Sequence, residues 1–292
     1  MKILVIPDIH NRYLSAQSLI DRLDYDKCIL LGDYFDSYGD TWMDAENTAI
    51  WLRDKVLTNP KIVPLIGNHD TNYFWPWHPD LRCSGFTDAK RDAIRKIITQ
   101  DHVNQFDFFH VESDFVFSHA GLTVQVWKDI KMNFDPYDES KETRLEQFVR
   151  ILSYWIDKTK SDLLKNARVP LLEPGWDRGG RIPNGGIDWV DWSNFASVKG
   201  VNQIVGHSPH NVPEVHIQYT DGSYTKKTVT EYCKFKKEFD RNKVSINFDL
   251  DTHSNHYAII TDGQVEVWDA MYDLPISKLI QYHIPESSMG RL

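Results

Sequence analysis

Residues 1–36 read MKILVIPDIHNRYLSAQSLIDRLDYDKCILLGDYFD, and the pattern of this stretch decides the fold. Two short apolar runs, Ile3–Ile6 and Cys28–Leu31, are each bounded by charged or turn-forming residues, as buried strands are. Between these runs, the leucines of residues 14–23 follow the spacing of one helical face. A strand, a helix and a second strand within so short a length favour a parallel β-α-β unit.

The same alternation continues outward from this unit. Three further apolar runs, Ile62–Ile66, Phe115–Phe117 and Ile204–Val205, are typical of buried strands. Helical spacing recurs in residues 45–56 and again in residues 87–99. These elements extend the parallel, strand-helix pattern along the first two thirds of the chain.

The C-terminal part has a different character. Residues 145–164 predict a long amphipathic helix, followed by a loop rich in Gly and Pro. Asp221-Gly222 and Asp262-Gly263 then each separate two alternating runs, which is a strong hairpin signal. The chain therefore begins as α/β and ends in hairpins, which indicates two sheets packed together.

Length and composition limit the class of protein. The 292 residues carry 33 basic and 42 acidic side chains, and the net charge of −9 argues against bulk binding to nucleic acid or to an anionic membrane. No apolar stretch approaches the length of a membrane span or of a signal-peptide core. Three scattered cysteines fit neither a disulfide framework nor a thiolate metal site, so we expect a reducing, cytoplasmic location. We expect one domain over residues 1–292, with a helical insertion at about 130–170 and a charged hairpin insertion at about 213–243.

Every one of the five predicted strands ends in polar side chains that can bind a metal. In open α/β sheets, ligands bind at the carboxyl ends of the strands, so these side chains can converge on one point. Six of them are Asp8, His10, Asp33, Asn68, His119 and His207. Imidazole and oxygen ligands without thiolate suit two divalent cations, and two such ions clamp an in-line phosphoryl displacement when a carboxylate bridges them. We expect two divalent ions, with manganese as the first choice and iron, zinc, nickel or cobalt as alternatives.

In this order, the sequences DIH, GDYFD, GNHD, SHAG and GHSP resemble the five motifs of the calcineurin-like metallophosphoesterases. The resemblance covers residues 1–210 and implies a four-layer α/β/β/α sandwich with a dinuclear metal centre between the sheets. Motif by motif, it implies that Asp8 and His10 hold the first metal and that Asp33 bridges. It also implies that the second metal is completed by Asn68, His119 and His207.

The resemblance further implies that His69 protonates the leaving group and that Asp36 orients His69. The form Gly-His-Ser-Pro at 206–209 is similar to the bacterial and phage protein phosphatases and to the diadenosine tetraphosphatases, where the first metal has three protein ligands. His210 does not have the spacing of the second His of a Gly-His-x-His motif. That branch usually has an Arg directly after the GDxxD motif, where this chain has Ser37.

Arg178 and Arg181 stand where the branch carries its second substrate arginine, and Arg178 is the better match. Asn68 is expected to contact substrate as well as metal. The expected function is hydrolysis of a phosphomonoester or nucleotide, including a dinucleoside polyphosphate, by a metal-bridging water or hydroxide. The alternatives are a phosphoprotein phosphatase, a phosphodiesterase on nucleic acid or cyclic nucleotide, and a non-catalytic binding module, which the complete set of six ligands disfavours.

Aromatic residues follow two of the motifs and suggest a stacking surface for a nucleobase. Residues 73–77 read YFWPW, and a loop that packs on its own aromatics is the favoured reading there. Near the GDYFD motif, the same two alternatives, a stacking surface or packing within the protein, apply to four more aromatic residues: Tyr34, Phe35, Tyr38 and Trp42.

Overall fold

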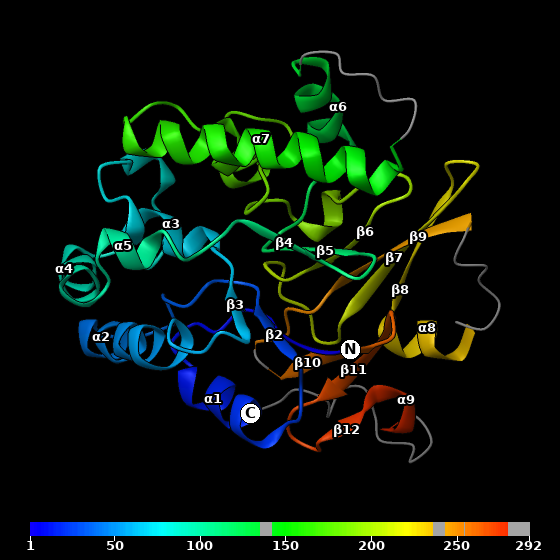
Figure 1. Ribbon diagram of the computed structural model, residues 1–292, viewed down its shortest axis with the longest axis horizontal. Helices are drawn as coiled ribbons and strands as arrows, with labels where there is room; N and C mark the ends of the chain where they lie inside the picture. Colours follow the sequence, from blue (N-terminus) through cyan, green and yellow to red (C-terminus); the bar gives the residue numbers. More distant parts are fainter. Residues whose placement is uncertain (135–141, 236–242, 254, 280–292) are drawn as a thin grey trace.

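Two six-stranded mixed sheets form the centre of the protein (Figure 1). The computed structural model describes residues 1–292 except 135–141, 236–242, 254 and 280–292. The first sheet has the order β12 (Leu274–Pro275), β11 (Gln264–Asp269), β10 (His256–Thr261), β1 (Lys2–Ile6), β2 (Lys27–Leu30) and β3 (Ile62–Pro64). The second sheet has the order β4 (Phe109–Glu112), β5 (Phe115–Ser118), β6 (Asn202–Val205), β9 (Val244–Asp249), β7 (Glu214–Tyr219) and β8 (Tyr224–Thr228).

The strand directions confirm the expected change from parallel to antiparallel pairing. β1, β2 and β3 are parallel to one another, and so are β5, β6 and β9, whereas the remaining pairs are antiparallel. Both predicted hairpins are present, as β7–β8 and β10–β11. In the second of them, Asp262 and Gly263 have φ angles of 49° and 73°, the two left-handed residues that a two-residue type I′ turn requires.

Strand alternation divides the side chains between an inner and an outer core. Ile3 of β1 points into the space between the sheets, where it packs in one cluster with Phe117 and Ile217 of the second sheet. The next residue, Leu4, points the other way and belongs to the cluster that contains Leu19 of the first helix. Because successive strand residues face opposite sides, a nearly continuous apolar run is what a sheet covered on both faces needs.

Helices cover the outer faces, so the predicted four-layer α/β/β/α arrangement is confirmed (Figure 1). The helices that flank the first sheet include α1 and α2, and α6 and α7 lie on the side of the second sheet. The bounds are α1 (Tyr13–Arg22), α2 (Trp42–Trp51), α3 (Asn68–Phe74), α4 (Asp88–Ile97), α5 (Gln100–Val103), α6 (Val124–Met132), α7 (Arg144–Leu164), α8 (Val229–Phe235) and α9 (Ile276–Leu279). A π-helical turn, Leu52–Val56, continues α2.

The helix predicted from residues 145–164 is confirmed as α7. Thr143 caps it, because its hydroxyl accepts from the Glu146 amide at 3.2 Å and its own amide donates to Glu146 Oε2 at 2.7 Å. Residues 213–243 contribute β7, β8 and α8 before the gap at 236–242. Within the described part of the chain, no helix combines the length and the apolar character that crossing a bilayer requires.

Candidate metal centre

The six side chains expected to bind metal lie together at the strand ends. Asp8 and His10 follow β1, Asp33 follows β2, and Asn68 begins α3 directly after the β3 segment. The other two, His119 and His207, follow β5 and β6 of the second sheet. Side chains from both sheets therefore meet at one edge of the sandwich.

Two groups of potential ligands share one carboxylate. Asp8, His10 and Asp33 offer ligand atoms that all lie within 4.8 Å of one another, and so do Asp33, His119 and His207. Asp33 is the residue common to both groups. Its Oδ2 lies 3.6 Å from His10 Nε2 and 3.4 Å from His119 Nε2. This is the position that a carboxylate bridging two cations has to occupy.

Tight backbone turns aim these side chains into the site. Asp33 and His207 have positive φ angles of 51° and 75°, so the chain turns sharply where each strand ends. Two glycines next to these turns, Gly67 and Gly206, lie so close to metal-binding carboxylates that they have no room for a side chain. A Cβ at Gly67 would lie 2.1 Å from Asp33 Oδ1, and a Cβ at Gly206 would lie 2.0 Å from Asp8 Oδ2. Glycine at these positions is therefore part of the geometry of the site.

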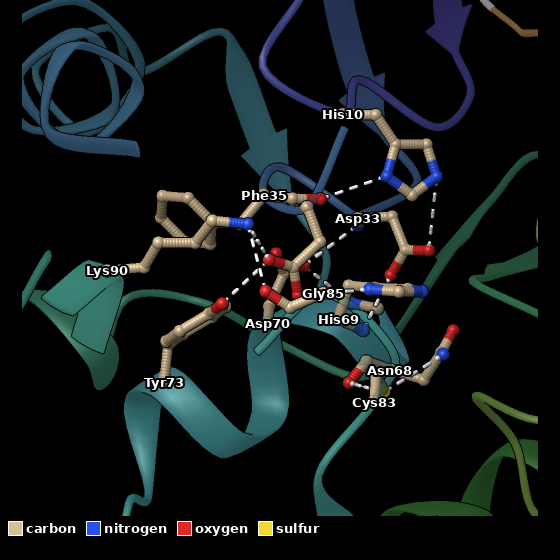
Figure 2. Close-up of polar contacts among 12 residues, drawn as sticks. His10, Asp33, Phe35, Asn68, His69, Asp70, Tyr73, Cys83, Gly85 and Lys90 are labelled. Atoms are coloured by element: carbon tan, nitrogen blue, oxygen red, sulfur yellow. Dashed lines mark hydrogen bonds and ion pairs between the residues drawn. The ribbon is translucent and has the colours of Figure 1, made fainter. Parts of the chain in front are cut away.

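Backbone carbonyls fix the orientation of two of the imidazole rings. His10 Nδ1 donates to the Phe35 carbonyl oxygen at 2.9 Å, and His119 Nδ1 donates to the Leu31 carbonyl oxygen at 3.0 Å (Figure 2 shows the former). Each ring therefore turns its Nε2 toward Asp33. Such hydrogen bonds select the tautomer that leaves Nε2 with a lone pair for a metal.

The donor atoms around Asn68 fit a cation. Asn68 Oδ1 lies 2.9 Å from both His119 Nε2 and His207 Nδ1, and these two nitrogens are 3.2 Å apart. With its Nδ1 hydrogen-bonded to the Leu31 carbonyl oxygen, His119 presents Nε2 to this cluster. A metal ion bound here would replace the proton on Nε2 and would accept lone pairs from the ring nitrogens and the amide oxygen.

Burial and charge shift the titration of these groups in a consistent way. Burial disfavours the charged form of His119, but the carboxylates of Asp33 and Asp8 outweigh it and raise the pKa of this imidazole to about 10. Burial and the neighbouring charge of His119 lower the pKa of His207 to about 3, so His207 stays neutral at pH 7. Burial and the proximity of Asp251 hold the pKa of Asp8 well above its usual range. A divalent cation bound here would offset the repulsion among the carboxylates of Asp8, Asp33 and Asp251.

His69 lies beside the metal-binding candidates and is held by Asp36. The His69 amide donates to Asp33 Oδ1 at 2.9 Å, and its ring centroid is 5.3 Å from that of His10. Its Nδ1 lies 3.1 Å from Asp36 Oδ2. Burial works against protonation of His69, but Asp33 and Asp36 raise its pKa above the ordinary value. The ring is therefore oriented, and its protonated form is favoured.

The structure reveals a support for Asp36 that the sequence pattern did not indicate. Asp36 Oδ1 accepts from Tyr73 Oη at 2.7 Å and from Lys90 Nζ at 3.0 Å (Figure 2 shows Lys90 and Tyr73). Lys90 Nζ also donates to Asp40 Oδ1 at 2.5 Å and to the Gly85 carbonyl oxygen at 2.9 Å. Sequence spacing could not have identified Lys90 as a partner of Asp36, because Asp36 lies in the loop after β2 and Lys90 reaches it from α4.

Asp70 also has a structural function that the GNHD motif alone does not reveal. Its carboxylate accepts from the amides of Asp33, Tyr34 and Gly67 at 2.8, 2.8 and 2.9 Å. These bonds tie the turn after β2 to the turn after β3. Asp70 thus fixes the backbone that carries Asp33, and its place within a strand-end motif is the signal that could have singled it out.

The two arginines expected to bind substrate lie in different surroundings. The Arg178 guanidinium makes a forked contact with Asp191, with Nε 3.0 Å from Oδ2 and Nη2 2.5 Å from Oδ1, and its charge reaches His207. Arg181 is more exposed and lies 3.4 Å from Asp80. Arg178 is therefore the more firmly held of the two, through its forked contact with Asp191.

The ring of His210 contacts two carboxylates. Its Nε2 lies 3.3 Å from Oδ2 of Asp249, a buried residue at the end of β9, and its Nδ1 lies 3.7 Å from Glu214 Oε1. Its amide donates to the Asp251 carbonyl oxygen at 3.0 Å.

Comparison with known proteins identifies the family. The sequence profile described as calcineurin-like phosphoesterase matches residues 1–240. No curated protein matches the chain.

Solved structures resemble the fold at low identity. The cold-active protein-tyrosine phosphatase of a psychrophile, Shewanella sp., is 13% identical with a TM-score of 0.51, covering 92% of this chain and 78% of that one. Another structure of a cold-active protein tyrosine phosphatase is 12% identical with a TM-score of 0.53, covering 92% and 76%. A metallophosphoesterase from Sphaerobacter thermophilus is 14% identical with a TM-score of 0.42, covering 91% and 86%.

At these identities the two cold-active phosphatases support the fold alone. The family rests on the profile match, which spans most of the chain and includes all six metal-binding candidates. Buried Asp and His clusters of the kind that such enzymes use lie within the matched region. The chain belongs to the calcineurin-like phosphoesterase family and is a metal-dependent phosphoric ester hydrolase.

Proposed function

We propose that the enzyme is a phosphomonoesterase with a dinuclear metal centre. Asp8 and His10 hold the first cation and Asp33 is shared by both. The second cation is completed by Asn68, His119 and His207. The single observation that supports this assignment is that Asp33 belongs to both groups of potential ligands. Manganese is the first metal to test, because the six proposed ligands offer imidazole and oxygen atoms, while the nearby Cys83 thiol donates to the Asn68 carbonyl oxygen.

The side chains have separate tasks in the proposed reaction. Two bound cations supply Lewis acidity and an activated water for attack on phosphorus. His69 gives its proton to the oxygen of the leaving alcohol, and Asp36 holds the imidazole in the orientation for that transfer. Arg178 offers a guanidinium fork to the phosphoryl oxygens once it exchanges its contact with Asp191.

We propose a small phosphomonoester or nucleotide, including a dinucleoside polyphosphate, as the substrate. The Gly-His-Ser-Pro sequence at 206–209 supports a place near the bacterial and phage protein phosphatases and the diadenosine tetraphosphatases. Ser37, where that branch usually has an Arg, argues against a phosphoprotein substrate. The occupied guanidinium of Arg178 favours a second candidate, a phosphodiesterase, because a diester carries less negative charge than a monoester.

A comparison of two chromogenic esters tests this function. Protein treated with chelator and reconstituted with Mn²⁺ is assayed on an aryl phosphate and on a bis-aryl phosphate. We expect faster turnover of the monoester, loss of activity after renewed chelation, and loss in Asp33→Asn, because one carboxylate serves both ions. Undiminished turnover after exhaustive chelation would refute the metal mechanism, and faster turnover of the diester would favour the second candidate. Fewer than about one ion bound per chain after reconstitution would favour a non-catalytic protein.

The acid role of His69 has its own test. We expect His69→Asn to reduce kcat most for esters with poor leaving groups and least for activated aryl esters, because a weakly basic aryloxide can leave without a proton whereas an alkoxide cannot. Equal losses on both kinds of ester would remove this role.

A further inference from the structure

A cavity of about 630 Å³ opens beside His69 and is not used by the mechanism above. Its lining includes Asp36, Tyr38, Asp40, Trp42, His69 and Lys90. In the proposed function His69 faces the leaving oxygen. Because the cavity shares His69 with the site, it is the candidate space for the rest of the leaving alcohol.

The aromatic side chains near the site fall into two classes. Tyr73, Phe74 and Trp75, which follow the GNHD motif, are at most 4% exposed and belong to the protein core. Tyr38 and Trp42, in contrast, are 107% and 48% exposed and both line the cavity. Large apolar rings left in water at the rim of a cavity are typical of a ligand-binding surface.

The loop that carries these two rings is anchored on both sides. Lys90 Nζ contacts two carboxylates of this loop, those of Asp36, which precedes Tyr38 in the chain, and of Asp40, which follows it. Asp40 also accepts from Asn11 Nδ2 at 2.6 Å through its other oxygen. Thr41 then caps α2, so that Trp42 is the first residue of a helix. A loop held in this way presents its rings in a defined position, which reduces the entropy lost when a ligand binds.

Charge limits what the cavity can accept. Of the described residues that line it, Lys90 is the only lysine or arginine, and it contacts two carboxylates, Asp36 and Asp40. Apart from His69, the charged groups of the lining are these two carboxylates and one ammonium group, which are paired with one another. The described lining therefore offers no further cation to a leaving group that carries a second phosphate, whereas an uncharged ring needs none.

We propose that this cavity is the leaving-group subsite and that it selects phosphate esters of uncharged aromatic alcohols through stacking on Tyr38 and Trp42. The inference rests on the proposed function, and it narrows the substrate from phosphomonoesters and nucleotides in general to aryl or arylmethyl monoesters. We infer that the ring belongs to a free small molecule, since Ser37 argues against a phosphoprotein, and a phosphotyrosyl residue is the alternative that the test separates. Aromatic pairs of this kind prefer offset-stacked or edge-to-face contacts.

The experiment measures kcat/KM for 2-naphthyl phosphate and for ethyl phosphate in the Mn²⁺-loaded wild type, Trp42→Ala, Tyr38→Ala and Trp42→Phe. The naphthyl-to-ethyl ratio is compared between proteins, so the intrinsic reactivity of each ester cancels. We expect the ratio to fall about 10-fold in Trp42→Ala and to recover largely in Trp42→Phe. Tyr154→Ala is the matched control, since Tyr154 is 52% exposed on α7 and does not line the cavity. Free phosphotyrosine and a phosphotyrosyl peptide, assayed in parallel, distinguish the two sources of the ring.

A binding measurement without metal separates this inference from the proposed function. Titration of 2-naphthol into metal-free protein, followed by calorimetry, is expected to give an affinity that Trp42→Ala lowers about 10-fold and Tyr154→Ala does not change. Absence of turnover of either ester with retained, Trp42-dependent binding would overturn the monoesterase function and keep the subsite. An unchanged naphthyl-to-ethyl ratio together with Trp42-independent binding, or faster turnover of nucleoside triphosphates than of 2-naphthyl phosphate, would overturn the subsite.

Discussion

Replacing Lys90 by methionine tests how the site is held together. Methionine has a similar length but no charge, so the change removes the cation between Asp36 and Asp40. Lys90 is 4% exposed, and each of the two carboxylates is at most 6% exposed, so water cannot take its place freely. Removing one partner of a buried ion pair costs about 3–5 kcal/mol. The remaining bonds of Asp36 to Tyr73 and of Asp40 to Asn11 place the expected loss near the lower end, at about 3 kcal/mol.

Urea unfolding of metal-free protein measures this loss, since bound metal would add its own contribution to stability. Lys96→Met is the matched control, because Lys96 is an exposed lysine of the same helix, α4. We expect Lys96→Met to stay within about 0.5 kcal/mol of the wild type. The double variant Lys90→Met/Asp40→Asn should recover part of the loss by removing one of the two uncompensated charges. A Lys90→Met protein as stable as the control would refute the reasoning, because the buried carboxylates would then need no cation.

Three further perturbations address the metal centre and the second sheet. Gly206→Ala places a Cβ 2.0 Å from Asp8 Oδ2 and should weaken Mn²⁺ binding at least 10-fold in a calorimetric titration; unchanged affinity would show that Asp8 takes no part. Mn²⁺ at 100 times the dissociation constant of a site should stabilise chelator-treated protein by about 2.7 kcal/mol for each ion bound, measured by urea unfolding, and the gain should shrink in Asp33→Asn. Burial and the charge of Lys226 lower the pKa of His216 from its ordinary value of 6.5 to about 4. The unfolded chain therefore takes up a proton before the folded protein does, and stability is lost as the pH falls from 6.5 toward 4. The free energy of unfolding of metal-free protein is measured at pH 7 and at pH 5. We expect His216→Gln to make the difference between these two values about 2 kcal/mol smaller than in the wild type. An unchanged difference would contradict the lowered pKa.

The sequence predicted the sheets well because buried strands leave a strong local signal. A sheet covered on both faces needs apolar residues on both sides of each strand, and Ile3 and Leu4 satisfy that need in opposite directions. The Asp-Gly turns were equally readable. Gly222, Asp262 and Gly263 have left-handed φ angles, which few residues other than glycine and Asp or Asn adopt without strain.

The aromatic residues were harder to assign from sequence. Tyr73 and Tyr38 both follow strand-end motifs, but Tyr73 is buried against Asp36 whereas Tyr38 is fully exposed. Apolar side chains look alike in a sequence whether they cover a core or a ligand. Their exposure depends on which helices happen to pack over them, and this is a property of the assembled chain.

From local periodicity and turn chemistry, the sequence by itself indicated nine of the twelve described strands, four of the helices and the residue types at the ends of the first five predicted strands, but not β4, β9 or β12. Only the tertiary structure decided that Asp33 stands between His10 and His119, that Asn68 joins His119 to His207, and that Lys90 reaches Asp36. These contacts join residues far apart in the chain, and their distances are set by how two sheets pack through side chains that no local pattern records.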